Sequence, residues 1–147
     1  MKDNCLIIIP TYNEAENIKA VINKIFSLND NNSILVVDDN SPDGTSNIVE
    51  NLTKDNTGKL FLITREKKDG LGSAYKVGFK WALEQNFSYI FEMDADLSHD
   101  PNEIKNLKRF LINNECDVAI GSRYLEGVSV VNWPLSRIFL SYFANIY

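Results

Sequence analysis

Residues 5–14 read CLIIIPTYNE, five apolar residues followed directly by a polar segment. A strand with one side in solvent alternates apolar and polar residues, whereas a strand buried on both faces is apolar throughout. Cys5 to Ile9 therefore predicts a strand in the interior of a parallel sheet. The segment that begins at Pro10 would then lie at the carboxyl edge of this sheet.

The same pattern recurs along the chain. Further apolar runs at 34–37, 60–63, 89–93 and 118–120 predict four more strands. Residues with helical spacing lie between them, among them Ile18, Val21, Ile22 and Ile25, and later Tyr75, Phe79, Ala82 and Leu83 as inward positions. This alternation predicts an α/β fold, a Rossmann-like, mostly parallel sheet with helices on both faces, in one domain over residues 1–147.

The bulk properties are those of a folded protein without a nucleic-acid surface. Of the 147 residues, 44% are hydrophobic and 24% are charged. The net charge of −5 gives no general surface for nucleic acid. Cys5 and Cys116 lack metal-ligand spacing, which favours structural thiols and a cytosolic location. No apolar run reaches the roughly 18 residues of a membrane span.

Asp94-Ala95-Asp96 is the strongest candidate for chemistry, because it directly follows the apolar run 89–93. Two carboxylates that converge at a strand end repel each other unless a cation lies between them. Such oxygen ligands suit Mg²⁺ or Mn²⁺, completed by water and substrate phosphates. The alternative is a helix-capping turn with two solvated acids. The position after a buried strand favours a metal site that binds a diphosphate.

The segments after the first two strands are predicted to bind a nucleotide. Tyr12 offers its ring to a base. Glu14 offers an acceptor, although it would equally stabilise the N-terminus of the next helix. Asp39 is predicted to contact base or ribose, with capping of the following turn as the alternative. For Asp38, contact with the ligand and bracing of the backbone are expected equally.

Cationic side chains have less specific roles. Arg123 follows the fifth apolar run and is predicted to bind phosphate or acceptor, with a surface ion pair as the alternative. Lys67 and Lys68 lie in a glycine-containing loop, 65–72, and are as readily explained as a solvated surface. His99 is either a base or a cap beside the aspartates. Neither a Walker loop nor a dinucleotide fingerprint is present, which disfavours a nicotinamide-dependent oxidoreductase.

Five motifs, in order along the chain, resemble the dolichol-phosphate mannosyltransferases. They are IPTYNE at 9–14, DDNSPDGT at 38–45, REKKDGLG at 65–72, DADLSH at 94–99 and GSRY at 121–124. The first and fourth are typical of the wider family 2 of inverting glycosyltransferases, which have the GT-A fold. The SPDGT and DADLSH strings together point to the polyprenyl-phosphate branch of that family.

The resemblance implies transfer of mannose from GDP-mannose to a dolichyl or polyprenyl phosphate, with Mg²⁺ or Mn²⁺ as cofactor. The implied substrate-binding residues are Pro10, Tyr12, Glu14, Val37, Asp39, Asp94, Ala95, Asp96, Arg123, Arg137 and Ser141. Asp94, Asp96 and Ser98 would hold the metal, and Asp96 and Arg123 would have the catalytic roles. A lipid acceptor implies a peripheral protein at the cytoplasmic face of a membrane.

The final segment departs from the family pattern. It matches an acceptor-recognition segment at Trp133, Pro134, Arg137 and Ser141. Tyr142 and Phe143 then replace a basic residue and a glycine. Family members continue further, so the chain is expected to be truncated at its C-terminus. Residues 133–147 have helical apolar spacing, which predicts either a core-packing helix or an interfacial helix that faces the lipid acceptor.

Two alternatives stay open for the function. A family 2 glycosyltransferase with UDP-glucose or another donor, or with a different acceptor, fits the same motifs, because the choice of base depends on few contacts. A non-catalytic fragment would bind the nucleotide sugar without turnover.

Overall fold

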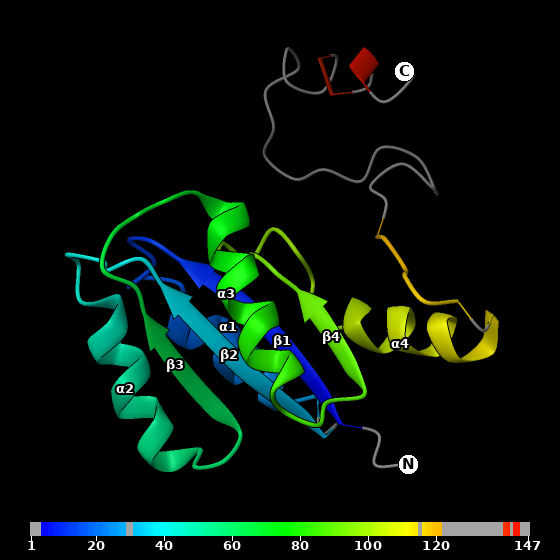
Figure 1. The fold of residues 1–147 in the computed structure, drawn as a ribbon, viewed down its shortest axis with the longest axis horizontal. Helices are drawn as coiled ribbons and strands as arrows, with labels where there is room; N and C mark the ends of the chain where they lie inside the picture. The colour runs from blue at the N-terminus through cyan, green and yellow to red at the C-terminus, as the bar shows by residue number, and fades with distance from the viewer. Residues whose placement is uncertain (1–3, 29–30, 115, 122–139, 142, 145–147) are drawn as a thin grey trace. The chain divides into compact units, whose positions relative to one another are not determined.

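The computed structural model describes residues 4–28, 31–114, 116–121, 140–141 and 143–144. The chain divides into two compact units, residues 1–109 and 110–147. Strands and helices alternate as β1 (Cys5–Thr11), α1 (Ile18–Phe26), β2 (Asn32–Asp38), α2 (Thr45–Asp55), β3 (Leu60–Thr64), α3 (Leu71–Leu83), β4 (Tyr89–Glu92) and α4 (Glu103–Asn114) (Figure 1). The predicted alternation is therefore confirmed for these elements.

The strands form one parallel sheet in the order β3-β2-β1-β4. The central strands β1 and β2 are buried almost throughout, as their apolar runs predicted. Ile8 on β1 pairs with Leu35 on β2 and with Glu92 on β4. Successive strands are added on one side of β1 as far as β3, and β4 is then added on the other side. In such a sheet the point of reversal, here between β1 and β4, opens a crevice at the carboxyl ends of the strands.

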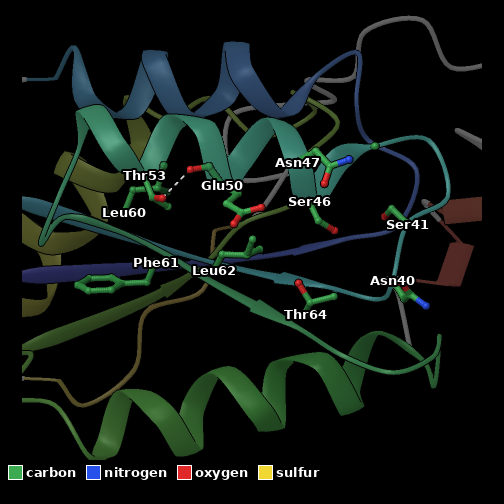
Figure 2. A pocket seen from close by; sticks show the side chains of 11 residues that line it. Asn40, Ser41, Ser46, Asn47, Glu50, Thr53, Leu60, Phe61, Leu62 and Thr64 are labelled. Carbon is green, nitrogen blue, oxygen red and sulfur yellow. Dashed lines mark hydrogen bonds between the residues drawn. The ribbon is translucent and has the colours of Figure 1, made fainter.

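Helices cover both faces of the sheet. On one face, Ile7 and Ile9 of β1 pack in a buried cluster with α1 and α2, which contribute residues such as Ile22 and Val49. On the other face, Leu6 and Ile8 pack with α3. Figure 2 shows the blue and teal helices, α1 and α2, on one side of the strands and the green helix α3 on the other. Alternate residues of β1 therefore face opposite apolar layers, as a fully buried strand requires.

Small residues form the face of α3 that lies on the sheet. Ala74, Gly78 and Ala82 are buried, whereas Phe79 is 37% exposed and Leu83 is 80% exposed. The prediction that Phe79 and Leu83 point inward is therefore wrong. A Cβ atom on Gly78 would lie 2.6 Å from Ile8 Cγ2, so the missing side chain allows α3 to approach β1 closely. The small residues take the contact face because only they permit this approach.

The predicted fifth strand is absent from residues 116–121, which have no strand structure. Val118 and Ile120 are largely exposed. A three-residue run can form only a few ladder hydrogen bonds, and these do not stabilise a strand whose apolar side chains stay in solvent. The prediction for 118–120 is therefore wrong for this structure.

The predicted helix at 133–147 lies mostly outside the described residues. Within that segment, the structure describes residues 140–141 and 143–144, and these are helical. Leu140 and Phe143 are exposed. Among the helices that are described, none combines the length and the apolar character needed to cross a membrane.

Candidate functional site

A pocket of about 310 Å³ lies at the point of reversal of the sheet. It is lined by Pro10, Thr11, Tyr12, Glu14, Asp39, Lys68, Gly70, Leu71, Ala74, Asp94, Ala95 and Asp96. These residues come from the end of β1, from the segments that follow β1, β2, β3 and β4, and from α3. The pocket is therefore the crevice that a parallel sheet of this order provides for a ligand.

Seven of the predicted site residues meet in this one pocket, namely Pro10, Tyr12, Glu14, Asp39, Asp94, Ala95 and Asp96. Their separation in sequence shows that the sheet, not local sequence proximity, brings them together. The pocket also contains Lys68, whose role the sequence left open, and Leu71, which was not predicted. The loop 65–72 was recognised as a motif, but its path over the pocket cannot be read from residue spacing.

Asp94 and Asp96 occupy the turn that follows β4. The Asp96 Oδ1 atom accepts a hydrogen bond of 2.9 Å from the Ser98 backbone N–H. Burial acts to raise the pKa of Asp96, but hydrogen bonds from Ser98 and the nearby His99 outweigh it and lower the pKa from its ordinary value. Asp96 is therefore ionised at neutral pH, as a metal ligand must be.

His99 and Ser98 support this turn. The Asp94 backbone N–H donates a hydrogen bond to His99 Nδ1 at 3.4 Å. His99 Nδ1 also lies 3.9 Å from Asp94 Oδ2. Neither His99 nor Ser98 lines the pocket. His99 therefore has the geometry of a residue that holds the turn, and the Ser98 contacts are with Asp96.

The carboxylates fit a cation that a substrate helps to bind. Within the described part of the chain, no group of three or more His, Cys, Asp or Glu residues is arranged to hold a metal ion. Asp94 and Asp96 nevertheless both face the pocket. Mg²⁺ usually takes one or two carboxylates and completes its shell with water and substrate phosphates. Two carboxylates at an open pocket suit that mode of binding.

Asp38 has a structural role. Its carboxylate is fully buried and accepts hydrogen bonds from the Thr11 hydroxyl at 2.7 Å, from the Ser41 N–H and hydroxyl at 2.9 and 2.6 Å, and from the Ser46 hydroxyl at 2.5 Å. Burial acts to raise its pKa, but these bonds together lower it. Of the two alternatives for Asp38, bracing of the backbone is the one that these contacts satisfy.

The motif DDNSPDGT ties the loops after β1 and β2 together. Asp43 accepts a hydrogen bond of 2.9 Å from the Ala15 N–H, and Thr45 accepts one of 3.0 Å from the Glu14 N–H. The Ser41 hydroxyl accepts another of 3.0 Å from the Asn13 N–H. These bonds fix the backbone of the segment that carries Tyr12 and Glu14.

Asp39 forms an ion pair with Arg65, which the sequence analysis did not single out. The Arg65 Nε atom lies 2.9 Å from Asp39 Oδ1, and the two side chains are 10% and 7% exposed. The Arg65 Nη1 atom is buried and has no hydrogen-bond partner. Because low exposure weakens screening by water, this pair holds the Asp39 carboxylate firmly at the wall of the pocket.

Of the five remaining predicted site residues, Val37 and Ser98 lie in the same unit as the pocket and do not line it. Val37 is fully buried in the apolar layer beneath α3. Ser141 is half-buried within the second unit. Arg123 and Arg137 lie outside the described residues.

A second, larger pocket lies beside the edge strand β3 and helix α2 (Figure 2). Its volume is about 780 Å³. Among the described residues of its lining, Glu50 alone is charged, and the rest are serine, threonine, asparagine, glycine and apolar residues. A lining without basic side chains or paired carboxylates does not suit a diphosphate or its metal. The pocket between β1 and β4 is therefore the better candidate for the functional site.

The comparison with known families agrees with this geometry. The profile of glycosyl transferase family 2 matches residues 6–147. The chain belongs to glycosyl transferase family 2. The motifs that resembled this family are thus correctly assigned.

Two relatives of this family 2 chain have names that refer to polyprenyl lipids. Polyprenol monophosphomannose synthase of Mycolicibacterium smegmatis is 44% identical over 142 residues, which are 97% of this chain and 53% of that protein. Dolichol-phosphate mannosyltransferase of Pyrococcus furiosus is 42% identical over 137 residues, which are 92% of this chain and 37% of that protein. The chain therefore spans about half or less of the length of these relatives.

A solved mannosyltransferase has a similar fold. A mannosyltransferase from Pyrobaculum calidifontis, in complex with GDP-Man and Mn²⁺, matches with a TM-score of 0.62 and 25% identity, over 73% of this chain and 32% of that one. The predicted GT-A-like α/β fold is therefore confirmed. The roles of the individual site residues stay predictions.

Proposed function

We propose that this family 2 chain transfers mannose from GDP-mannose to a polyprenyl phosphate, with inversion at the anomeric carbon. The observation that carries the proposal is the convergence of Asp94 and Asp96 with Tyr12, Glu14 and Asp39 in one pocket. The names of the two relatives support mannose as the sugar and a polyprenyl phosphate as the acceptor. The solved mannosyltransferase supports GDP-mannose as the donor.

The nucleoside would bind where the carboxylates of Glu14 and Asp39 line the pocket. Both can accept hydrogen bonds from base N–H and ribose O–H groups. The ion pair with Arg65 restrains Asp39, and the bond from Thr45 restrains the Glu14 backbone. Donor groups would therefore meet acceptors whose positions are set before binding, which lowers the entropic cost of binding.

Asp94 and Asp96 would hold a Mg²⁺ or Mn²⁺ ion together with the donor diphosphate. When bound, such an ion neutralises charge that develops on a leaving diphosphate. The chain contributes two carboxylates at the pocket and keeps Asp96 ionised through its hydrogen bonds with Ser98.

In the transfer step, an oxygen of the lipid phosphate would attack the anomeric carbon of mannose. A new carbon–oxygen bond forms, the bond from that carbon to the diphosphate breaks, and GDP leaves with the electron pair. A phosphate oxygen is ionised at neutral pH, so no protein base is required. His99, which accepts a hydrogen bond from the Asp94 backbone, therefore does not need to act as a general base. Catalysis would rest on positioning and electrostatic stabilisation. We assign binding of the acceptor phosphate to Arg123, Arg137 and Ser141.

Because a polyprenyl phosphate resides in a bilayer, the chain would act as a peripheral protein at the cytoplasmic face of a membrane. Flotation with vesicles that contain undecaprenyl phosphate tests this point. Binding to these vesicles, and weaker binding to vesicles without the lipid phosphate, is the expected result. Absence of binding to both kinds of vesicle would contradict the membrane assignment.

The decisive experiment combines calorimetry with a transfer assay. The chain is titrated with GDP-mannose and UDP-glucose, each with and without Mn²⁺, and is assayed for transfer of labelled mannose to undecaprenyl phosphate. GDP-mannose should bind in a metal-dependent manner. Asp96→Ala should lower transfer by at least about 100-fold and leave the circular dichroism spectrum unchanged, and the exposed Asp55→Ala variant should match the wild type.

The other outcomes distinguish the alternatives. Metal-dependent binding of UDP-glucose alone would replace the proposed donor. Binding of GDP-mannose without any transfer would favour the non-catalytic fragment. Full transfer by the Asp96→Ala variant would refute the metal assignment.

A further inference from the structure

A lysine of the loop between β3 and α3 covers one face of a pocket aromatic ring. The Lys68 Nζ atom lies 4.0 Å from the centroid of the Tyr12 ring. Both residues line the same 310 Å³ pocket as Asp94 and Asp96. An ammonium over an aromatic ring is attracted by the negative face of the ring. Tyr12 therefore fixes the position of a cation at the mouth of the candidate donor site.

The loop that carries Lys68 is fastened at both ends. At its start, the Arg65 N–H donates to the Asp38 carbonyl oxygen at 2.8 Å, and the Arg65 side chain pairs with Asp39. At its end, the Ser73 hydroxyl donates to Asp69 Oδ2 at 3.3 Å beside the first turn of α3. Gly70 has a φ of 82°, which a glycine adopts without strain and which turns the loop into the helix. These contacts hold the backbone on either side of Lys68, an exposed residue that also lines the pocket.

Lys68 forms no ion pair within the part of the chain that the structure describes. Among the described residues, Lys24 pairs with Asp100 and Arg65 pairs with Asp39, and the His99 imidazole lies near Asp94. Lys68 takes part in none of these contacts. A cation that faces a pocket, packs on a ring and lacks a counter-ion is suited to an anionic group of a ligand.

We propose that Lys68 binds the diphosphate of the nucleotide donor and that Tyr12 is its positioning residue, rather than a platform on which the base stacks. The ammonium covers one face of the ring, so a base that stacked on that face would have to displace it. The inference rests on the proposed function, because it takes the pocket as the site of a nucleotide-sugar donor. It adds a phosphate-binding residue and assigns a different role to Tyr12.

Binding of a graded ligand series to the full chain tests the proposal. GDP, GMP and guanosine are titrated against the wild type, Lys68→Gln, Tyr12→Leu and Tyr12→Phe, with Lys67→Gln as the matched control. Lys68→Gln should weaken GDP binding about tenfold, the loss of one charge-assisted contact, and should leave guanosine binding unchanged. Tyr12→Leu should reproduce this pattern, Tyr12→Phe should keep wild-type affinity, and the Tyr12→Leu/Lys68→Gln double variant should be no weaker than Lys68→Gln.

A measurement without ligand tests the contact itself. In NMR spectra of the wild type, the Lys68 ε-methylene protons should be shifted upfield by the ring current of Tyr12. The shift should vanish in Tyr12→Leu and persist in Tyr12→Phe. An unchanged Lys68 signal in Tyr12→Leu would refute the positioning role.

Two results would overturn the inference while the proposed function stands. One is equal GDP affinity of the wild type and the Lys68→Gln and Lys67→Gln variants, which would make Lys68 an ordinary solvated residue. The other is loss of guanosine binding in Tyr12→Leu as large as the loss of GDP binding, which would make Tyr12 a stacking platform. Failure of the wild type to bind GDP, GMP or guanosine would instead refute the proposed donor, and this inference with it.

Discussion

At the residue scale, the site depends on acidic side chains in different environments. Asp38 is fully buried and bonded to hydroxyl and N–H groups, Asp39 is paired with Arg65, and Asp96 faces the pocket. Asp38 and Asp39 are neighbours in sequence, and only their contacts show that the first braces the loops while the second lines the candidate pocket. No rule of spacing separates them, because they are consecutive residues at the end of the same buried strand.

We expect Asp38→Asn to lower the free energy of unfolding by about 2–4 kcal/mol at pH 7, because an amide cannot accept all of the bonds that the carboxylate accepts. The pKa of Asp38 is lowered from 3.8 in the folded chain. Its contribution to stability is therefore complete above the unfolded pKa and is lost as the pH falls through the folded pKa. Urea unfolding of the wild type should show this loss below about pH 4–5, and the variant should show a smaller one.

The exposed Asp55→Asn variant is the control for this measurement. It should unfold like the wild type both at pH 7 and in the acidic range. Equal stability of Asp38→Asn and the wild type at pH 7 would contradict the bracing role.

The Arg65–Asp39 pair gives a second prediction at this scale. Arg65→Met should lower the free energy of unfolding by about 3–5 kcal/mol, because it leaves a carboxylate that is only 7% exposed without its counter-ion. The Arg65→Met/Asp39→Asn double variant should be less destabilised than Arg65→Met alone. Lys24→Met, which breaks the exposed Lys24–Asp100 pair, should change stability by less than about 1 kcal/mol. Thermal unfolding of the four proteins measures the difference, and similar losses for Arg65→Met and Lys24→Met would argue against a firm pair.

At the element scale, the sequence predicted strands β1 to β4 and the buried face of α1, but it was wrong about the fifth strand and the face of α3. The continuous apolar runs of β1 and β2 identify buried parallel strands, since few other elements are apolar at every position over so short a length. For α3, the large apolar residues suggested the wrong inward face. The helix packs through Ala74, Gly78 and Ala82 because close approach to β1 outweighs the burial of Leu83, and this depends on the distance between elements, which spacing does not record.

Gly78→Ala tests the close approach of α3 to β1. Alanine is the better helix former by about 0.8–1.0 kcal/mol, but its Cβ would lie 2.6 Å from Ile8 Cγ2 in the central strand. A branched side chain that is fully buried cannot rotate away, so the variant should be less stable by about 1–3 kcal/mol. Gly72→Ala on the same helix is the matched control, because no atom lies within 4 Å of its Cβ position, and it should be neutral or slightly stabilising. Denaturant unfolding distinguishes the two, and equal stability of both variants would show that the packing is looser than the structure indicates.

At the scale of the whole molecule, the candidate donor pocket belongs to one unit. All of its lining residues lie between Pro10 and Asp96, within the unit 1–109. The residues assigned to the acceptor phosphate, Arg123, Arg137 and Ser141, lie within the unit 110–147. Donor binding and transfer are thus assigned to different parts of the chain, which makes them experimentally separable.

Shortening the chain after Asn114, the last residue of α4, separates the two activities. Because every group that lines the pocket is retained, the shortened chain should bind GDP within about threefold of the affinity of the full chain, which corresponds to less than about 1 kcal/mol. It should transfer no mannose to undecaprenyl phosphate, because the proposed acceptor residues are gone. Calorimetry and the transfer assay measure the two quantities, and Asp96→Ala in the shortened chain controls for non-specific binding. Loss of GDP affinity by tenfold or more would place part of the donor site beyond residue 114, and retained transfer would remove Arg123 and Arg137 from the mechanism.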